Sequence, residues 1–237
     1  MCFVSVFDSL LAVLSLEYSA DNFVRSAAAL LQAKSVTAAD AANRISQAGS
    51  ASYTFDAHGQ TTAKTDTSGT TNYSWDARGR LTGVNLPGSQ TVNYAFDALG
   101  RRASRSYQGN TTSFVYDGAD VVADKVGANV AVDYLNGAGT DEKLRQGAVG
   151  NGLYFLTDHL GSTSALTNAS GGVVEQLQYE PFGGHSTSSF TRYTYTGRED
   201  DAATGLMHYR AREYNPQQGR FMTEDPAGLQ GGLNKYA

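Results

Sequence analysis

The sequence contains one cysteine, Cys2, so no disulfide can form within the chain. Charged residues make up only 17% of it, and the net charge of −5 leaves no basic stripe that could neutralise phosphates. We therefore expect no nucleic-acid partner. Its first apolar stretch, residues 1–16, contains Asp8 and lacks the positively charged start of a signal peptide. The stretch is also shorter than the roughly 20 apolar residues that a membrane helix needs, so we expect no membrane span.

Familiar catalytic and ligand-binding motifs are lacking too. The chain has no P-loop, no dinucleotide fingerprint and no G-x-S-x-G elbow. Its four histidines, which are His58, His159, His185 and His208, show no close metal-ligand spacing and have no cysteine set beside them. The sequence thus predicts neither a metal nor a cofactor. Asp158 and His159 are adjacent and could form a dyad, but a turn and packing role is favoured.

Glycine (26 residues) and tyrosine (14 residues) are plentiful, together with serine, threonine and asparagine. This composition favours strands and turns, so we expect an all-β fold. Residues 9–48 differ, because they are rich in alanine and leucine. Thr37 and Asp40 precede the run A-A-N-R-I-S-Q and then Gly49, a pattern typical of a short capped helix. We therefore predict a separate helical segment over residues 1–50, without an assigned role.

A repeat of about 20 residues begins at Tyr53. The aspartates of its four copies are 20, 21 and 20 residues apart, and two aromatic side chains precede each of them. Its signature residues are Tyr53, Asp56, Gly59, Tyr73, Asp76, Gly79, Tyr94, Asp97, Gly100, Tyr116 and Asp117. Each copy predicts a strand followed by a turn, with the aspartate as turn former rather than catalyst. Because one copy cannot bury its aromatic face alone, neighbouring copies should pair edge to edge.

The pattern Y-x-aromatic-D-x-x-G-R-L resembles the YD repeat of RHS proteins, teneurins and the C components of insecticidal toxin complexes. Downstream motifs occur in the order typical of RHS repeat-associated cores: D-H-L-G-S at residues 158–162, Y-E-P-F-G at 179–183, Y-T-G-R-E at 195–199, Y-R-A-R-E-Y-N-P at 209–216 and D-P-A-G at 225–228. We therefore divide the chain into the segment 1–50, YD/RHS repeats over 51–126 and an RHS-associated core over 127–237. The resemblance covers residues 53–237.

The resemblance implies a β-hairpin sheet that forms part of a hollow spiral shell, with the core as an inward plug. In complete cores it also implies an intramolecular aspartic protease that releases a C-terminal toxin. Arg212 matches the core arginine and Asp225 the first carboxylate, whereas the second aspartate is absent from this sequence. We expect the protease site to be incomplete here, and a structural ion pair between Arg212 and Asp225 is the favoured alternative. Glu213 stands where an aromatic is common.

Three functions remain open from the sequence. The favoured one is a structural shell fragment of a bacterial toxin protein, without activity of its own, or the remnant of such a gene. The second is an autoprotease completed by further residues. The third is a cell-surface module that binds carbohydrate or protein through stacked aromatics such as Trp75 and Tyr94. Expected partners are a C-terminal toxin or other shell segments, and self-association is expected because so few strands leave a sheet edge open. The family suggests secretion or a cell-surface location.

Overall fold

A computed structural model describes residues 36–148 and 150–237 of the chain. The described residues form nineteen strands and two short 3₁₀ helices, η1 (Tyr195–Gly197) and η2 (Gly228–Gly231). The predicted all-β fold is therefore confirmed. No helix within these ranges is long and apolar enough to cross a membrane.

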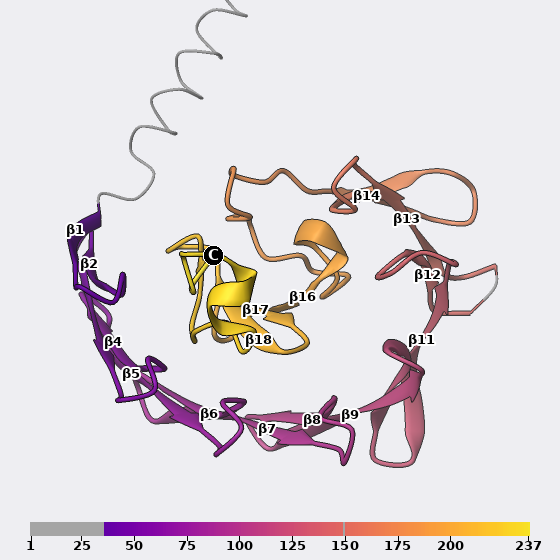
Figure 1. Cartoon of the computed structure of the whole chain (residues 1–237). Helices are drawn as coiled ribbons and strands as arrows, with labels where there is room; N and C mark the ends of the chain where they lie inside the picture. The colour runs from indigo at the N-terminus through magenta and orange to yellow at the C-terminus, as the bar shows by residue number, and fades with distance from the viewer. Residues whose placement is uncertain (1–35, 149) are drawn as a thin grey trace, which may run out of the picture. The chain divides into compact units, whose positions relative to one another are not determined.

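Fifteen antiparallel strands form the larger sheet, which we call the outer sheet, and they follow one another in sequence order. Turns and short loops join successive strands, so consecutive strands are hydrogen-bonded neighbours, and Figure 1 shows them along an arc. The strands are β1 (Val36–Ala39), β2 (Ile45–Ala48), β3 (Ala51–Phe55), β4 (Thr61–Asp66), β5 (Gly69–Trp75), β6 (Leu81–Leu86), β7 (Gln90–Phe96), β8 (Arg102–Tyr107), β9 (Asn110–Asp117), β10 (Asp120–Val126), β11 (Asn129–Asn136), β12 (Lys143–Gln146), β13 (Leu153–Thr157), β14 (Thr163–Thr167) and β15 (Val173–Gln176).

The first aromatic of each repeat is buried on one face of the outer sheet. Because side chains alternate along a strand, an aromatic at the same position of every second strand falls on the same face. The buried aromatics are Tyr53, Tyr73, Tyr94, Phe114, Tyr134 and Phe155, on β3, β5, β7, β9, β11 and β13. Their spacings are 20, 21, 20, 20 and 21 residues, so the period continues for two copies beyond those recognised in the sequence.

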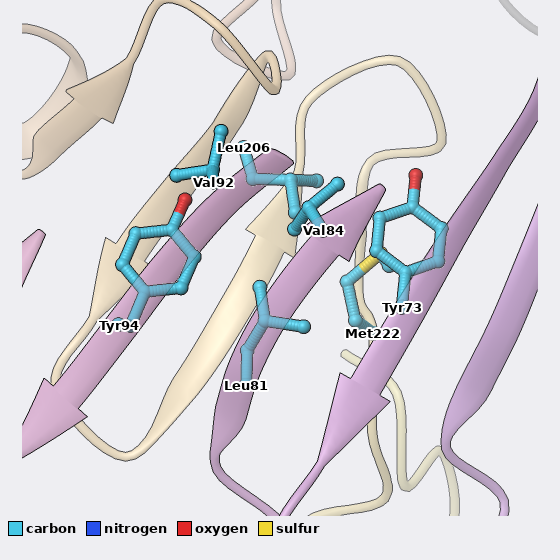
Figure 2. Packing of buried hydrophobic residues seen from close by; sticks show 7 residues of the cluster. All are labelled: Tyr73, Leu81, Val84, Val92, Tyr94, Leu206 and Met222. Carbon is cyan, nitrogen blue, oxygen red and sulfur yellow. The ribbon is translucent and has the colours of Figure 1, made fainter. Parts of the chain in front are cut away.

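A second antiparallel sheet, which we call the inner sheet, lies on the inner side of the arc (Figure 1). Its strands are β16 (Glu199–Asp201), β17 (Leu206–Tyr209), β18 (Arg212–Asn215) and β19 (Arg220–Phe221). Leu206 and Met222 from this region join Leu81, Val84 and Val92 of the outer sheet in one buried cluster (Figure 2). The inner sheet thus covers the apolar face that the repeats cannot bury themselves.

The helix expected around residues 37–48 is wrong, because this stretch forms β1, a turn and β2. Asp40 does not cap a helix. Its carboxylate accepts hydrogen bonds from the backbone N–H groups of Ala42 and Arg44, both within the turn between the two strands. The rest of the predicted helical segment, residues 1–35, lies outside the described residues. The expected boundary between the repeats and the core, at residues 126 and 127, falls where β10 ends and the turn to β11 begins. The outer sheet is continuous across it.

Candidate functional site

The aspartate of a repeat organises the turn that follows its strand. Oδ1 of Asp76 accepts the backbone N–H groups of Arg78 (2.9 Å) and Arg80 (3.0 Å), and Oδ2 accepts Nε–H of Arg80 (2.7 Å). Gly79 supplies the positive φ of +75° that such a turn requires. Burial alone would raise the pKa of Asp76, but its bonds to Arg80 outweigh burial and lower that pKa. Both oxygens of the carboxylate therefore accept hydrogen bonds within the turn.

The arginine of this turn also reaches the next repeat. The guanidinium of Arg80 lies 4.5 Å from the ring centroid of Phe96, and that of Arg101 lies 4.6 Å from the ring centroid of Tyr116. Arg101 additionally donates to the carbonyl of Gly118 at 2.6 Å. Each arginine thereby links the turn of its own repeat to the second aromatic of the following one, which fixes the spacing of neighbouring hairpins.

Two repeats depart from this arrangement. After Asp56 the arginine position holds Gln60, and the second aromatic of the next repeat is Trp75, whose indole N–H donates to the carbonyl of Thr61 (2.7 Å). In the other departing repeat, Asp117 lies directly opposite Asp120 in the antiparallel register of β9 and β10.

The structure shows two further copies of this turn, of which the one at Asp40 was missed in the sequence. At Asp40 the arginine follows four residues later as Arg44, and Asn43 takes the glycine position with a φ of +60°. Asp158 accepts the backbone N–H groups of Leu160 and Ser162 in the same way, which places it in a turn instead of a dyad with His159. The D-x-x-x-R spacing was the signal that would have revealed the copy at Asp40.

Buried charges connect the outer sheet to the inner sheet. Asp201 of β16 accepts the hydroxyl of Tyr94 at 2.7 Å and a two-pronged contact from Arg105, at 2.6 and 2.7 Å. Glu199, two residues earlier, forms ion pairs with Arg102 and Arg192. These carboxylates belong to the inner sheet, while Tyr94, Arg102 and Arg105 belong to the outer sheet.

The cations hold both carboxylates ionised. Burial alone would raise the pKa of Glu199, but the charges of Arg192 and Arg102 outweigh it and hold that pKa well below its ordinary value. Asp201 behaves likewise, since its hydrogen bond to Arg105 overcomes the effect of burial and lowers its pKa. The inner sheet is thus fastened by ion pairs as well as by apolar packing.

Glu213 occupies the position where an aromatic was expected and is buried on β18. Its Oε1 lies 2.7 Å from Nδ1 of His208 on the neighbouring strand β17, and the two residues are directly paired. The buried carboxylate therefore has a partner, which is the condition under which such a replacement is tolerated.

Arg212 and Asp225 are brought together, with Nη2 of the arginine 3.1 Å from Oδ2 of the aspartate. The guanidinium also lies 3.6 Å from the ring centroid of Phe221 and donates to the carbonyl of Lys235 at 3.3 Å. Asp225 accepts the backbone N–H of Ala227 and donates its own N–H to Lys235. The pair therefore holds the final turn and the segment around Lys235 against the inner sheet.

Groups of three or more histidine, cysteine, aspartate or glutamate side chains placed to hold a metal ion do not occur in residues 36–148 and 150–237. What the described site offers is a cross-braced interface between two sheets. The recurring units are turns, cation–aromatic contacts and buried ion pairs.

Comparison with known proteins explains this arrangement. A family model described as the teneurin YD-shell matches residues 4–126 and 142–231. The chain belongs to the teneurin YD-shell family. The match begins well upstream of Tyr53, where the first copy had been recognised, and so includes the β1–β2 hairpin.

Individual relatives of this YD-shell chain include toxin subunits and a surface protein. Toxin subunit YenC1 of Yersinia entomophaga is 35% identical over 91 residues, which cover 35% of this chain and 9% of that protein. Salivary gland surface protein 1 of Aedes aegypti is 38% identical over 95 residues, or 37% of this chain and 3% of that protein. The YD-shell chain thus spans less than a tenth of the length of these two relatives.

Solved structures show the same fold. The crystal structure of TcdB2-TccC3 without its hypervariable C-terminal region superposes with a TM-score of 0.55 at 20% identity, over 78% of this chain and 12% of that one. The YD-shell chain therefore has the fold of one part of that structure.

Proposed function

We propose that this chain forms part of the wall of a shell that encloses a toxin polypeptide. The observation that carries the proposal is the outer sheet with the inner sheet fastened to its inner side through Glu199 and Asp201. A curved sheet whose inner apolar face is covered by a second sheet can serve as a wall. The 35% sequence identity to toxin subunit YenC1 over 91 residues is the reason for proposing a toxin as the enclosed polypeptide.

A chimera tests this proposal. Residues 36–237 of the chain, which carry both sheets, replace the region of YenC1 around the 91-residue match, and the rate at which added protease digests the downstream polypeptide is measured. We expect the downstream polypeptide to be digested no faster in the chimera than in unmodified YenC1. A matched chimera with Arg102→Met and Arg105→Met, which lacks the two outer-sheet cations that face Glu199 and Asp201, should be digested faster. Rapid digestion in a well-folded unmodified chimera would contradict a wall function.

Autoprocessing is a second candidate, favoured by the ion pair between Arg212 and Asp225. Peptide hydrolysis by aspartates needs two carboxylates that share a proton, so a second aspartate must join Asp225. Co-expression with a downstream segment carrying another D-P-x-G-L motif, followed by intact-mass measurement, tests this. Release of a C-terminal piece that Asp225→Asn abolishes would support it, whereas an uncut, folded product would leave Arg212 and Asp225 as a structural pair.

Edge pairing is a proposed mode of association. Within the described residues β15 has one hydrogen-bonded neighbour, β14, and Val173 on it is 55% exposed. A second strand could add there through backbone hydrogen bonds. We expect light scattering to show dimers or larger species, and Val174→Pro, which places a proline in this edge strand, to shift them to monomers. A monomer at high concentration would contradict edge pairing.

Carbohydrate binding is not proposed, because its premise was a set of exposed, stacked aromatics. Tyr94 is buried beneath the inner sheet with its hydroxyl bonded to Asp201. Trp75 packs against the same apolar cluster and has its indole N–H bonded to Thr61.

A further inference from the structure

A cavity of about 270 Å³ lies where turns of the outer sheet meet the inner sheet. The outer sheet contributes Arg101, Asp120 and Lys143 to its lining, and the inner sheet contributes His208 and Arg210. At about 30 Å³ for each water molecule in the liquid, this volume could hold several waters or a small molecule. The cavity is separate from the Arg212–Asp225 pair, since neither residue lines it.

Each guanidinium that lines the cavity is matched by a carboxylate. Arg198 lies 2.8 Å from Asp141, and Arg210 lies 2.7 Å from Asp141 and 3.4 Å from Asp120. The two remaining arginines are also paired: Arg102 with Glu199 and Arg101 with Asp97. The charges within these pairs cancel, so the net positive charge of the cavity comes from its remaining cation.

That cation is Lys143, whose residue exposure is only 5%. Its Nζ donates to the carbonyl of Val121 at 3.2 Å and to Oδ1 of Asn136 at 2.6 Å, and lies 4.6 Å from the ring centroid of Tyr193. Within residues 36–148 and 150–237, Lys143 forms no ion pair with a carboxylate, and its hydrogen-bond partners are uncharged. A buried ammonium without a counter-ion is costly.

The pKa of Lys143 also reflects a positive charge that its surroundings do not fully compensate. Burial lowers the pKa of Lys143, and the more distant carboxylates of Asp120, Glu199 and Asp141 offset this only in part. An ammonium has three N–H donors, of which two are accounted for by Val121 and Asn136. One donor and one positive charge are therefore left for a ligand.

A second unsatisfied donor belongs to Arg102, a residue that lines the same cavity. Nε of Arg102 is buried without a hydrogen-bond partner in the described part of the chain, and the whole residue is only 3% exposed. His208 presents a ring whose Nδ1 is already held by Glu213. Buried donors without acceptors on two neighbouring cations are a chemical match for an acceptor that carries negative charge.

We propose that this cavity binds a small oxyanion, such as a phosphate or a carboxylate group, with Lys143 as its principal ligand. The anion accepts the third N–H of Lys143 and supplies the missing counter-charge at the junction of the two sheets. Because the site includes residues of both sheets, a bound anion would also tie the inner sheet to the outer sheet. The proposal does not depend on toxin enclosure.

Thermal unfolding of the whole chain tests the site. Melting temperatures are recorded in rising sodium phosphate, in sodium acetate and in sodium chloride, all at one ionic strength. Since a ligand that binds the folded state stabilises it by mass action, we expect phosphate or acetate to raise the melting temperature above the chloride value. Because phosphate also stabilises folded proteins without a specific site, a rise with phosphate identifies a phosphate site only when Lys143→Met abolishes it. A rise with acetate that the same variant abolishes identifies a carboxylate site. Equal melting temperatures in all three salts would overturn the proposal.

Variants locate the effect. Lys143→Met keeps an unbranched side chain beside Tyr134 and Tyr193 but removes the charge, and should weaken oxyanion binding at least tenfold. Lys64→Met on β4, which does not line the cavity, is the matched control and should respond like the unmodified chain.

An unchanged response in Lys143→Met would overturn the proposal. If that variant does not fold, Arg210→Met serves instead, because its side chain is 38% exposed and removing it leaves Asp120 facing the cavity. Binding should again weaken at least tenfold, and an unchanged affinity would exclude an oxyanion site here.

Discussion

The hydroxyl of Tyr94 donates a 2.7 Å hydrogen bond to Oδ2 of Asp201, a residue 107 positions later in the chain. Tyr94 is the first aromatic of a repeat, and Asp201 lies on the first strand of the inner sheet. The same ring therefore packs in the apolar cluster and binds the inner sheet through its polar end.

Tyr94→Phe should test this contact directly. The ring and its packing remain, while a buried hydrogen bond to a charged acceptor is lost, so we expect the free energy of unfolding to fall by about 1.5–3 kcal/mol. Urea denaturation followed by tyrosine fluorescence would measure it. Tyr107→Phe removes an exposed hydrogen bond to Gln90 and should cost far less. Equal losses would mean that the Tyr94 hydroxyl does not fasten the inner sheet.

Acid should weaken the junction between the two sheets through Glu199. Its folded pKa is held below the ordinary value, so its contribution is fully present above the unfolded pKa of about 4.3 and is lost as the pH falls below it. Burial raises the pKa of Asp141 and Asp200, and these two groups act in the opposite direction. A comparison with Glu199→Gln isolates the first effect.

Glu199→Gln leaves Arg102 and Arg192 without this carboxylate and should cost about 3–5 kcal/mol at neutral pH. Urea denaturation of both proteins between pH 7 and pH 2.5 should show that difference shrinking below about pH 4.3. A difference that stays constant over the whole range would show that the charge of Glu199 does not stabilise the fold.

The turn aspartates should tolerate asparagine better than alanine. Asp76→Ala removes acceptors for two backbone N–H groups and for Arg80, at about 0.5–1.5 kcal/mol for each bond. Asp76→Asn keeps the backbone bonds, because Asn168 already accepts two backbone N–H groups in a similar turn of this chain. Thermal unfolding should rank the unmodified chain, asparagine and alanine in that order. Identical stability of the two variants would mean that the turn bonds do not matter.

Gly59 should be the least replaceable of the turn glycines compared here. Its φ is +75°, and a Cβ there would collide with the hydroxyl of Tyr236, which itself donates to the Gly59 carbonyl at 2.9 Å. Gly109 has a φ of +78° but open space around it, so Gly109→Ala should cost only the backbone strain of about 1–2 kcal/mol. We expect Gly59→Ala to cost more and to expose residues 225–237 to protease. Equal stability losses in the two variants would indicate that Tyr236 is not anchored at Gly59.

Local chemistry in the sequence was sufficient to predict the repeat and its strands. Alternating aromatics mark one face of a strand, and aspartate with glycine marks the turn after it, so Tyr73, Asp76 and Gly79 predict a hairpin without knowledge of any distant residue. The same rules misjudged residues 37–48, because alanine-rich composition suggested a helix. There the outcome was set by pairing: β2 is hydrogen-bonded to β3, and the Asp40 turn repeats the turns further along the sheet.

The sequence by itself determined the hairpins, since each depends on residues within about 20 positions of one another, and its motifs drew attention to Arg212 and Asp225. Only the tertiary structure decided which charges meet. Asp201 was unremarkable in the sequence, yet it receives Tyr94 and Arg105, and Lys143 stands out only because every neighbouring arginine already has a carboxylate. Burial and pairing of charges depend on residues about 100 positions apart, and no local pattern carries that information.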